Sequence, residues 1–150
     1  MSLRVLVVDD HHDTVALFVE VLRHAGFDAL GTTRANEALS LTIADPPAVL
    51  VVDIAMPDLD GRELATLVRS YANTKHVRLV AVSAHAFDFS RFFVPGGGGW
   101  DACLRKPCDP DALVATVRSV LREIPPGKQS GTRRLFLDAV VPKKEGAKGT

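Results

Sequence analysis

Short apolar runs alternate with segments of helical spacing along most of this chain, and this alternation limits the possible folds more than any other feature. Five runs are expected to form strands, at residues 3–8, 27–32, 48–53, 77–84 and 101–105. Five further segments are expected to form helices, at residues 13–25, 36–44, 62–72, 87–94 and 112–123. Strands that are apolar throughout and alternate with helices indicate a parallel sheet covered on both faces. The predicted fold class is therefore α/β, a doubly wound five-stranded parallel sheet.

Charge is distributed unevenly along the chain, although the formal net charge is zero. Residues 1–124 hold 12 Lys+Arg against 16 Asp+Glu, whereas residues 125–150 hold 6 against 2. A mildly acidic body lacks the basic face typical of nucleic-acid binders, so no nucleic-acid partner is expected. We predict one domain at 1–124 and a basic Gly/Pro/Lys-rich C-terminal tail at 125–150, without an output domain. Binding of the tail to an anionic partner is the alternative to a mobile end.

The cellular compartment is predicted from cysteine usage and from the absence of targeting signals. The two cysteines, Cys103 and Cys108, do not make a disulfide framework, which favours a reducing compartment. The first ten residues lack the apolar core of a signal peptide. No apolar run approaches the roughly 18 residues that span a membrane. A cytoplasmic location and no membrane partner are expected.

Polar side chains stand where the predicted strands end. Asp9 and Asp10 follow the first strand, Asp53 ends the third, Ser83 lies near the end of the fourth, and Lys106 follows the fifth. Ligands of open parallel sheets bind beyond the carboxyl ends of the strands, so these side chains are expected to converge there. Three close carboxylates resist joint ionisation, and Mg²⁺ with oxygen ligands relieves that repulsion. With a lysine and a hydroxyl added, the set predicts phosphoryl transfer to a carboxylate oxygen.

Four motifs together resemble the receiver domain of two-component response regulators. They are "VLVVDDHH", "LVVDIAMPDLDG", "VAVSAHA" and "CLRKP", in this order, and the match covers residues 3–124. An Asp-Asp pair after a strand is common, but the order and spacing of all four motifs are specific. The resemblance implies a flavodoxin-like (βα)5 fold with strand order 2-1-3-4-5.

The resemblance also implies roles for the acidic residues. Asp53 would accept the phosphoryl group. Asp10 would hold Mg²⁺ together with Asp9, Asp53 and the backbone carbonyl of Ala55. The domain would then be a phosphoacceptor rather than an enzyme, with only its own phosphorylation and dephosphorylation as chemistry.

Further roles and the partners follow from the same resemblance. Ser83 would hydrogen-bond a phosphoryl oxygen as the switch residue, and Lys106 would pair with the phosphoryl group, its bond to Pro107 being cis. The donor would be a histidine kinase or a phosphotransfer protein. The output would be contact with a downstream protein through the face made by the fourth helix, fifth strand and fifth helix, and a homodimer is possible.

Three positions depart from the family pattern. Cys103 replaces the usual aromatic switch residue, and Trp100 is a candidate substitute for that ring. His85 and Ala55 flank the path of the hydrolytic water, so His85 is expected to influence the phosphoryl lifetime. The four phenylalanines of segment 87–94 are expected to be partly core and partly an apolar docking patch.

Four alternatives stay open. In the first, the chain is a receiver-like interaction domain that works without phosphorylation, because Cys103 stands where the family has an aromatic residue. In the second, it is a Mg²⁺-dependent phosphatase with an aspartyl nucleophile, and Ala55 disfavours this because it offers no second acid. In the third, His11 and His12 are transition-metal ligands, and their adjacency disfavours this because both side chains cannot point into one site. In the fourth, Cys103 and Cys108 form a redox pair, although a small buried hydrophobe is the commoner role.

Overall fold

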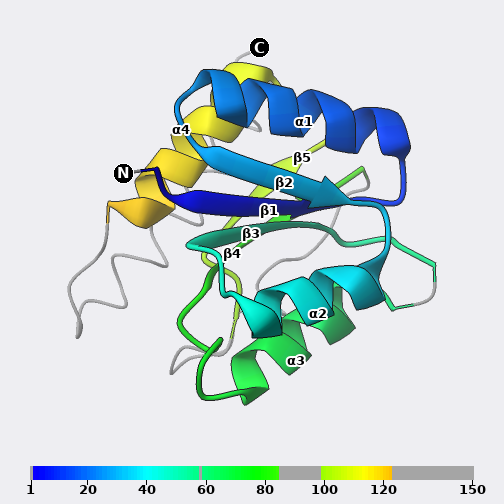
Figure 1. Ribbon diagram of the computed structural model, residues 1–150. Helices are drawn as coiled ribbons and strands as arrows, with labels where there is room; N and C mark the ends of the chain where they lie inside the picture. The colour runs from blue at the N-terminus through cyan, green and yellow to red at the C-terminus, as the bar shows by residue number, and fades with distance from the viewer. Residues whose placement is uncertain (1, 58, 85–98, 123–150) are drawn as a thin grey trace, which may run out of the picture.

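The computed structural model describes residues 2–57, 59–84 and 99–122, which form a five-stranded sheet with four helices (Figure 1). The strands are β1 (Arg4–Val8), β2 (Asp28–Thr32), β3 (Val49–Asp53), β4 (Arg78–Ser83) and β5 (Ala102–Arg105). The helices are α1 (His12–His24), α2 (Ala35–Ala44), α3 (Gly61–Ser70) and α4 (Pro110–Leu121). All strand pairs are parallel, in the order β2-β1-β3-β4-β5. The predicted fold class and strand order are confirmed.

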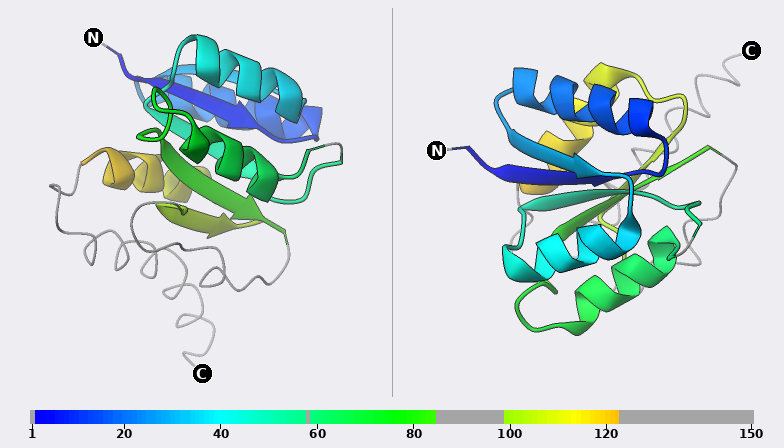
Figure 2. Two further views of the ribbon diagram at one scale, coloured as in Figure 1. Left: turned by 90° about the horizontal axis from the view of Figure 1, so that it is seen from below. Right: turned by 45° about the vertical axis from the view of Figure 1, so that its right-hand side comes forward.

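Helices cover both faces of the sheet, α1 and α4 on one side and α2 and α3 on the other (Figure 2). Successive strand residues point to opposite faces, so β1, β3, β4 and β5 each supply both layers. In β3, Leu50 and Val52 join the core beside α2 and α3, whereas Val49 and Val51 join the core beside α1 and α4. All five residues of β3 are buried. This two-sided burial explains why the sequence of β3 is apolar throughout rather than alternating.

Local signals at helix ends account for several boundaries. Gly26 has a φ of 101°, and this left-handed conformation ends α1 as predicted. Asp109 caps α4 by accepting a hydrogen bond from the Asp111 amide, and Pro110 occupies the first turn. Asp60 caps α3 in a capping box with Glu63, which the sequence interpretation had not identified.

Some boundaries differ from those predicted. The first helix begins at His12 rather than at residue 13, because the capping position is His11. The third helix ends at Ser70, two residues before its predicted end, where the backbone of Tyr71 turns to an extended conformation. The predicted helix at 87–94, with its phenylalanines, and the tail at 125–150 lie outside the described residues. Helix α4 is therefore the predicted fifth helix.

None of the helices in the described part of the chain has the length and apolar character needed to cross a membrane.

Candidate functional site

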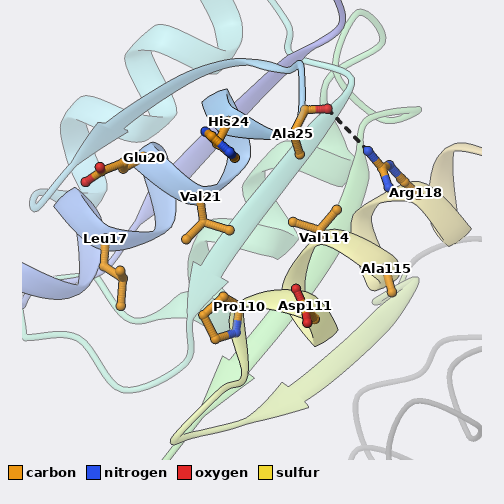
Figure 3. Close-up of a pocket in the computed structure, with 10 residues that line it drawn as sticks. All are labelled: Leu17, Glu20, Val21, His24, Ala25, Pro110, Asp111, Val114, Ala115 and Arg118. Atoms are coloured by element: carbon orange, nitrogen blue, oxygen red, sulfur yellow. Dashed lines mark hydrogen bonds between the residues drawn. The ribbon is translucent and has the colours of Figure 1, made fainter.

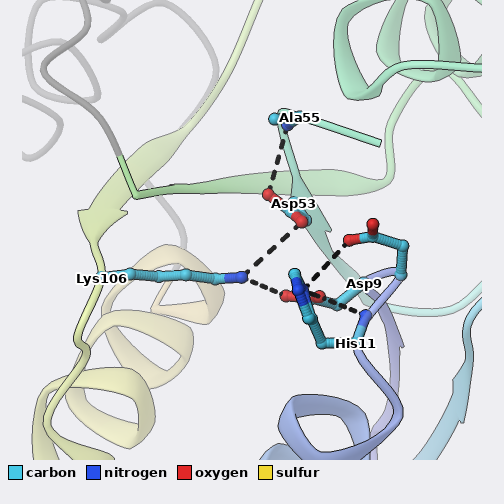
Figure 4. Close-up of polar contacts among 6 residues, drawn as sticks. Asp9, His11, Asp53, Ala55 and Lys106 are labelled. Atoms are coloured by element: carbon cyan, nitrogen blue, oxygen red, sulfur yellow. Dashed lines mark hydrogen bonds and ion pairs between the residues drawn. The ribbon is translucent and has the colours of Figure 1, made fainter. Parts of the chain in front are cut away.

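The carboxyl ends of β1, β3 and β5 bring two acids and a lysine together at one edge of the sheet (Figure 4). The Lys106 Nζ lies 2.5 Å from Asp9 Oδ2 and 3.6 Å from Asp53 Oδ2. The side chains of Asp9 and Asp53 are only 2% and 5% exposed, and that of Lys106 is 19% exposed. The three groups thus form a mostly buried charge cluster, as the positions of their strand ends predicted.

Asp53 is the last residue of β3, and its surroundings disfavour the ionised form. Burial and the nearby charge of Asp9 raise its pKa from 3.8 to about 6, while Lys106 and the Ala55 amide act in the opposite direction. The Ala55 N–H donates to Asp53 Oδ1 over 3.2 Å and orients the carboxylate. Without a metal ion, the charge of the ionised Asp53 carboxylate is therefore poorly compensated at neutral pH, even with Lys106 nearby.

Lys106 stays a cation in this pocket. Its partial burial lowers the pKa, but the hydrogen bond to Asp9 and the charges of Asp53 and Asp9 outweigh that effect, so the pKa is raised. The peptide bond between Lys106 and Pro107 is cis, in agreement with the expectation.

Four residues at this edge offer atoms suited to holding a metal ion. One ligand atom each from Asp9, Asp10, His11 and Asp53 can be chosen so that all lie within 4.8 Å of one another. Three of the four donors are carboxylate oxygens, the ligands that Mg²⁺ prefers. The donor set therefore fits the predicted metal, and His11 adds a nitrogen that the prediction did not include.

Ser83 lies at the same edge as this cluster. It is the buried last residue of β4 and pairs in register with Arg105. The Lys106 amide donates to the Ser83 carbonyl over 2.8 Å, which fixes the backbone of the lysine beside that of the serine. The structure thus places Ser83 next to the cluster, whereas His85 lies outside the described residues.

Gly61 lets α3 begin close to Asp53. A Cβ at residue 61 would lie 2.6 Å from the carbonyl oxygen of Asp53 and 2.9 Å from the Cα of Ile54. Both distances are far shorter than van der Waals contact, and both neighbours are backbone atoms, so a side chain here would require the backbone to shift. Glycine therefore lets the loop from Asp53 to α3 close without that strain.

Cys103 and Trp100 are fully buried members of the core on the α2 and α3 side. Cys108 packs instead against the core on the α1 and α4 side, and no disulfide joins the two described cysteines. Because the two cysteines pack on opposite faces of the sheet, the structure disfavours the redox-pair alternative, as expected. Trp100 shares the core of Cys103, where a ring can compensate for the volume of the missing aromatic.

A buried ion pair at the opposite edge of the sheet was missed by the sequence interpretation. Arg69, on α3, donates to the Asp101 carboxylate over 3.0 Å and to the carbonyls of Gly99 and Val77 over 2.9 and 2.5 Å. Asp101 also accepts from the Leu79 amide over 2.7 Å. Burial lowers the pKa of Arg69, though Asp101 opposes this effect. The cluster connects α3 to the starts of β4 and β5, and no local sequence motif predicts it.

A hollow of about 680 Å³ lies between α1 and α4, away from the charge cluster (Figure 3). Its walls include Leu17, Val21 and Val114, and Arg118 donates to the Ala25 carbonyl at one end over 3.3 Å. None of the predicted site residues lines it. The hollow is a surface feature of the helical layer rather than part of the candidate site.

The fold and the site together define a doubly wound α/β domain with an acidic pocket and a lysine at the carboxyl edge of its sheet. Comparison with known families gives a match to the response regulator receiver domain over residues 5–118. The chain belongs to this family, whose members are regulatory domains of two-component signalling.

Relatives and solved structures agree with this assignment. The chain is 35% identical to an uncharacterised 14.6 kDa protein of Leptolyngbya boryana, with 81% of this chain and 92% of that protein covered. It is 26% identical to the polar-differentiation response regulator DivK of Brucella abortus, with coverages of 81% and 98%.

Among structures, a Francisella response regulator receiver domain superposes with a TM-score of 0.69 at 27% identity, with coverages of 81% and 98%. The chemotaxis protein CheY4 of Vibrio cholerae gives a TM-score of 0.73 at 23% identity, with coverages of 80% and 99%, and shows the same fold.

Proposed function

We propose that this domain accepts a phosphoryl group on Asp53 from a histidine kinase or a phosphotransfer protein and signals by protein contact. The observation that carries the proposal is the position of the Lys106 ammonium, which contacts Asp9 and lies 3.6 Å from Asp53. A cation held between a carboxylate acceptor and its acidic neighbours is placed to stabilise negative charge that arrives with a phosphoryl group.

The residues divide the work of the transfer. An oxygen of Asp53 attacks phosphorus, the bond between phosphorus and the donor histidine nitrogen breaks, and the histidine keeps that electron pair and takes up a proton. The Ala55 amide holds the other Asp53 oxygen, and Lys106 pairs with a phosphoryl oxygen. The Ser83 hydroxyl donates to a second phosphoryl oxygen. Mg²⁺ held by Asp9, Asp10, Asp53 and the Ala55 carbonyl would neutralise the charge of the carboxylates and of the transferred group.

The phosphorylated side chain carries a charge of about −1.5 to −2 in place of the −1 of the ionised Asp53 carboxylate, so phosphorylation makes this edge of the sheet more negative. The segment after Ser83 connects the site to the face formed by the predicted fourth helix, β5 and α4, and that face is the proposed surface for a downstream protein or a second copy. Cys103 is fully buried in the core and has no ring, so no aromatic side chain at this position can move between the surface and the interior. The readout is therefore proposed to depend on the Ser83 segment without an aromatic partner at residue 103.

Two other functions remain to be separated from this one. A phosphorylation-independent interaction domain is favoured by the buried Cys103 in place of the switch aromatic. An aspartyl-nucleophile phosphatase is disfavoured because Ala55, two residues after Asp53, has no carboxylate to protonate a leaving group. Turnover of small phosphorylated compounds would support the phosphatase.

The test is labelling of the full chain with acetyl phosphate in Mg²⁺, read by mass spectrometry of the intact protein. We expect the wild type to gain one phosphoryl group, which peptide mapping assigns to Asp53. The Asp53→Asn variant should gain none, whereas Asp13→Asn, an exposed acid on α1, should behave as the wild type. Labelling that persists in Asp53→Asn, or in excess chelator, would contradict the proposed chemistry. Absence of labelling in the wild type would favour the interaction domain, and profiling against the kinases of the same organism would then identify any donor.

A further inference from the structure

We infer that His11 is a nitrogen ligand of the metal pocket and makes it select first-row transition ions over Mg²⁺ more strongly than an all-oxygen pocket does. The inference rests on the proposed function, since it concerns the same pocket. It refines the expectation of the sequence, in which the adjacency of His11 and His12 argued against both side chains pointing into one metal site.

The geometry separates the two histidines. The His11 Nδ1 lies 3.3 Å from Asp9 Oδ1 and 3.3 Å from Asp10 Oδ1. The His11 backbone N–H also donates to Asp9 Oδ1 over 2.9 Å, and this short turn directs the ring back toward the acids (Figure 4). His12 is the exposed first residue of α1 and does not belong to the ligand cluster. One histidine therefore points into the pocket while its neighbour begins the helix.

The spacing of the donor atoms is close to that of a coordination sphere. Opposite ligands of an octahedral ion with bonds of about 2.1 Å lie about 4.2 Å apart. The four donor atoms lie within 4.8 Å of one another, so small side-chain movements bring them onto one ion. The His11 side chain is 72% exposed. Its ring can therefore bind from the open side of the pocket, next to the positions that water and phosphoryl oxygens need.

The chemistry of the added donor sets the selectivity. Mg²⁺ is a hard ion that prefers oxygen ligands, whereas neutral imidazole suits later divalent ions. An all-carboxylate pocket already binds later ions somewhat more tightly, following the usual order of divalent affinities. A nitrogen ligand from His11 increases the difference in affinity between these ions and Mg²⁺, because only the later ions accept imidazole readily.

The rival role for His11 is a protonated counter-ion that neutralises the acids. The two roles predict opposite changes in the metal affinity of the pocket when the His11 ring is removed. Loss of a ligand weakens binding of transition ions and lowers their preference over Mg²⁺. Loss of a competing cation strengthens binding of every divalent ion, including Mg²⁺.

The experiment compares His11→Asn with His12→Asn, which removes the neighbouring ring from outside the pocket. Binding of Co²⁺ and of Mg²⁺ alone to the full chain is measured by calorimetry, and the visible absorption of bound Co²⁺ reports its ligands. We expect His11→Asn to lower the ratio of Co²⁺ affinity to Mg²⁺ affinity by about tenfold or more and to shift the Co²⁺ band. His12→Asn should match the wild type. The band should also disappear in Asp53→Asn, which assigns it to this pocket rather than to Cys108.

Either of two results would overturn the inference. One is a rise in affinity for both ions in His11→Asn, which identifies a counter-ion. The other is an unchanged ratio and spectrum, which identifies a ring that does not bind metal. Neither result contradicts the proposed function, as long as the wild type binds Mg²⁺ and accepts a phosphoryl group on Asp53. A wild type that binds neither ion and is not labelled on Asp53 contradicts both proposals together.

Discussion

At the scale of single residues, Asp53 illustrates how a buried ionised carboxylate opposes folding. Burial beside Asp9 raises its pKa from 3.8 to about 6. A group that binds its proton more tightly in the folded state favours folding when it is protonated. That contribution is fully present below about pH 3.8 and is lost as the pH rises through about 6. In the absence of metal, ionised Asp53 therefore destabilises the domain at neutral pH.

This reasoning predicts that Asp53→Asn is more stable than the wild type in chelator at about pH 7.5, by about 1–2 kcal/mol after allowance for solvent screening. The difference should shrink as the pH falls and nearly vanish near pH 4, where the wild-type carboxyl is protonated. Urea unfolding at a series of pH values measures it. A constant difference across the series would show that the substitution acts through packing rather than through ionisation.

The sequence predicted most of the candidate site because strand ends determine it. Asp9, Asp53 and Lys106 each follow an apolar run, and the parallel order of the strands brings those ends together. The orientation of His11 was not predictable in this way, since it depends on a turn in which the His11 amide binds the Asp9 carboxylate. The departure at Cys103 was visible in the sequence, but its complete burial beside Trp100 required the packed core.

At the scale of secondary-structure elements, the Arg69–Asp101 pair connects α3 to two strands that follow it in the chain. The pair is mostly buried and is completed by backbone carbonyls. Sequence reasoning missed it because the partners are 32 positions apart and share no motif. Removal of one partner leaves a buried charge without compensation, which is more harmful than loss of an exposed pair.

We predict that Arg69→Met lowers the free energy of unfolding by about 2–4 kcal/mol. Arg62→Met is the control, because Arg62 lies on the same helix in an exposed pair with Asp60 and should change stability by less than about 1 kcal/mol. Chemical unfolding of both variants measures the effect. Equal losses would contradict the assigned importance of the buried cluster. A double substitution with Asp101→Ala should cost less than the sum of the single changes.

The start of α3 gives a second prediction at this scale. In Gly61→Ala the new Cβ meets the backbone of Asp53 and Ile54, so we expect a loss of about 1–3 kcal/mol and slower labelling of Asp53. Gly31→Ala serves for comparison, since its Cβ would meet side chains of α1, such as that of Val15, on the other side of the sheet. It should lose stability without slower labelling once both variants are fully folded. Normal labelling in Gly61→Ala would show that the loop can relax without moving the acceptor.

At the scale of the whole molecule, the alternation of strands and helices was sufficient to predict a parallel sheet covered on both faces, whereas the strand order came from the resemblance to the receiver family. The inner strands β1, β3 and β4 are buried on both faces, so their sequences carry a strong signal, and parallel connections require helices between the strands. Helix ends were less predictable where backbone geometry rather than a cap residue stops the helix, as at Ser70 and Tyr71.

The domain boundary at residue 124 remains a prediction, and it can be tested directly. Among the described residues, the last one that packs against either core cluster is Leu121. A chain shortened to residues 1–124 should therefore unfold cooperatively, with a Tm within about 3 °C of the full chain, and should still accept a phosphoryl group on Asp53. Calorimetry and labelling check both expectations. A broad transition or a large fall in Tm would show that the segment 125–150 is part of the domain.

The contact between Lys106 and Asp9 joins positions 97 residues apart, and the lysine follows the short strand β5 at the end of the strand order. During synthesis the acids of β1 and β3 emerge long before this lysine does. An unfinished chain thus carries the proposed acceptor Asp53 without Lys106, and a local opening of β5 recreates that condition in the folded protein. Under the proposed function, the ability to be phosphorylated therefore depends on completion of the fold. A donor that requires the assembled pocket would phosphorylate only molecules in which the last strand has docked.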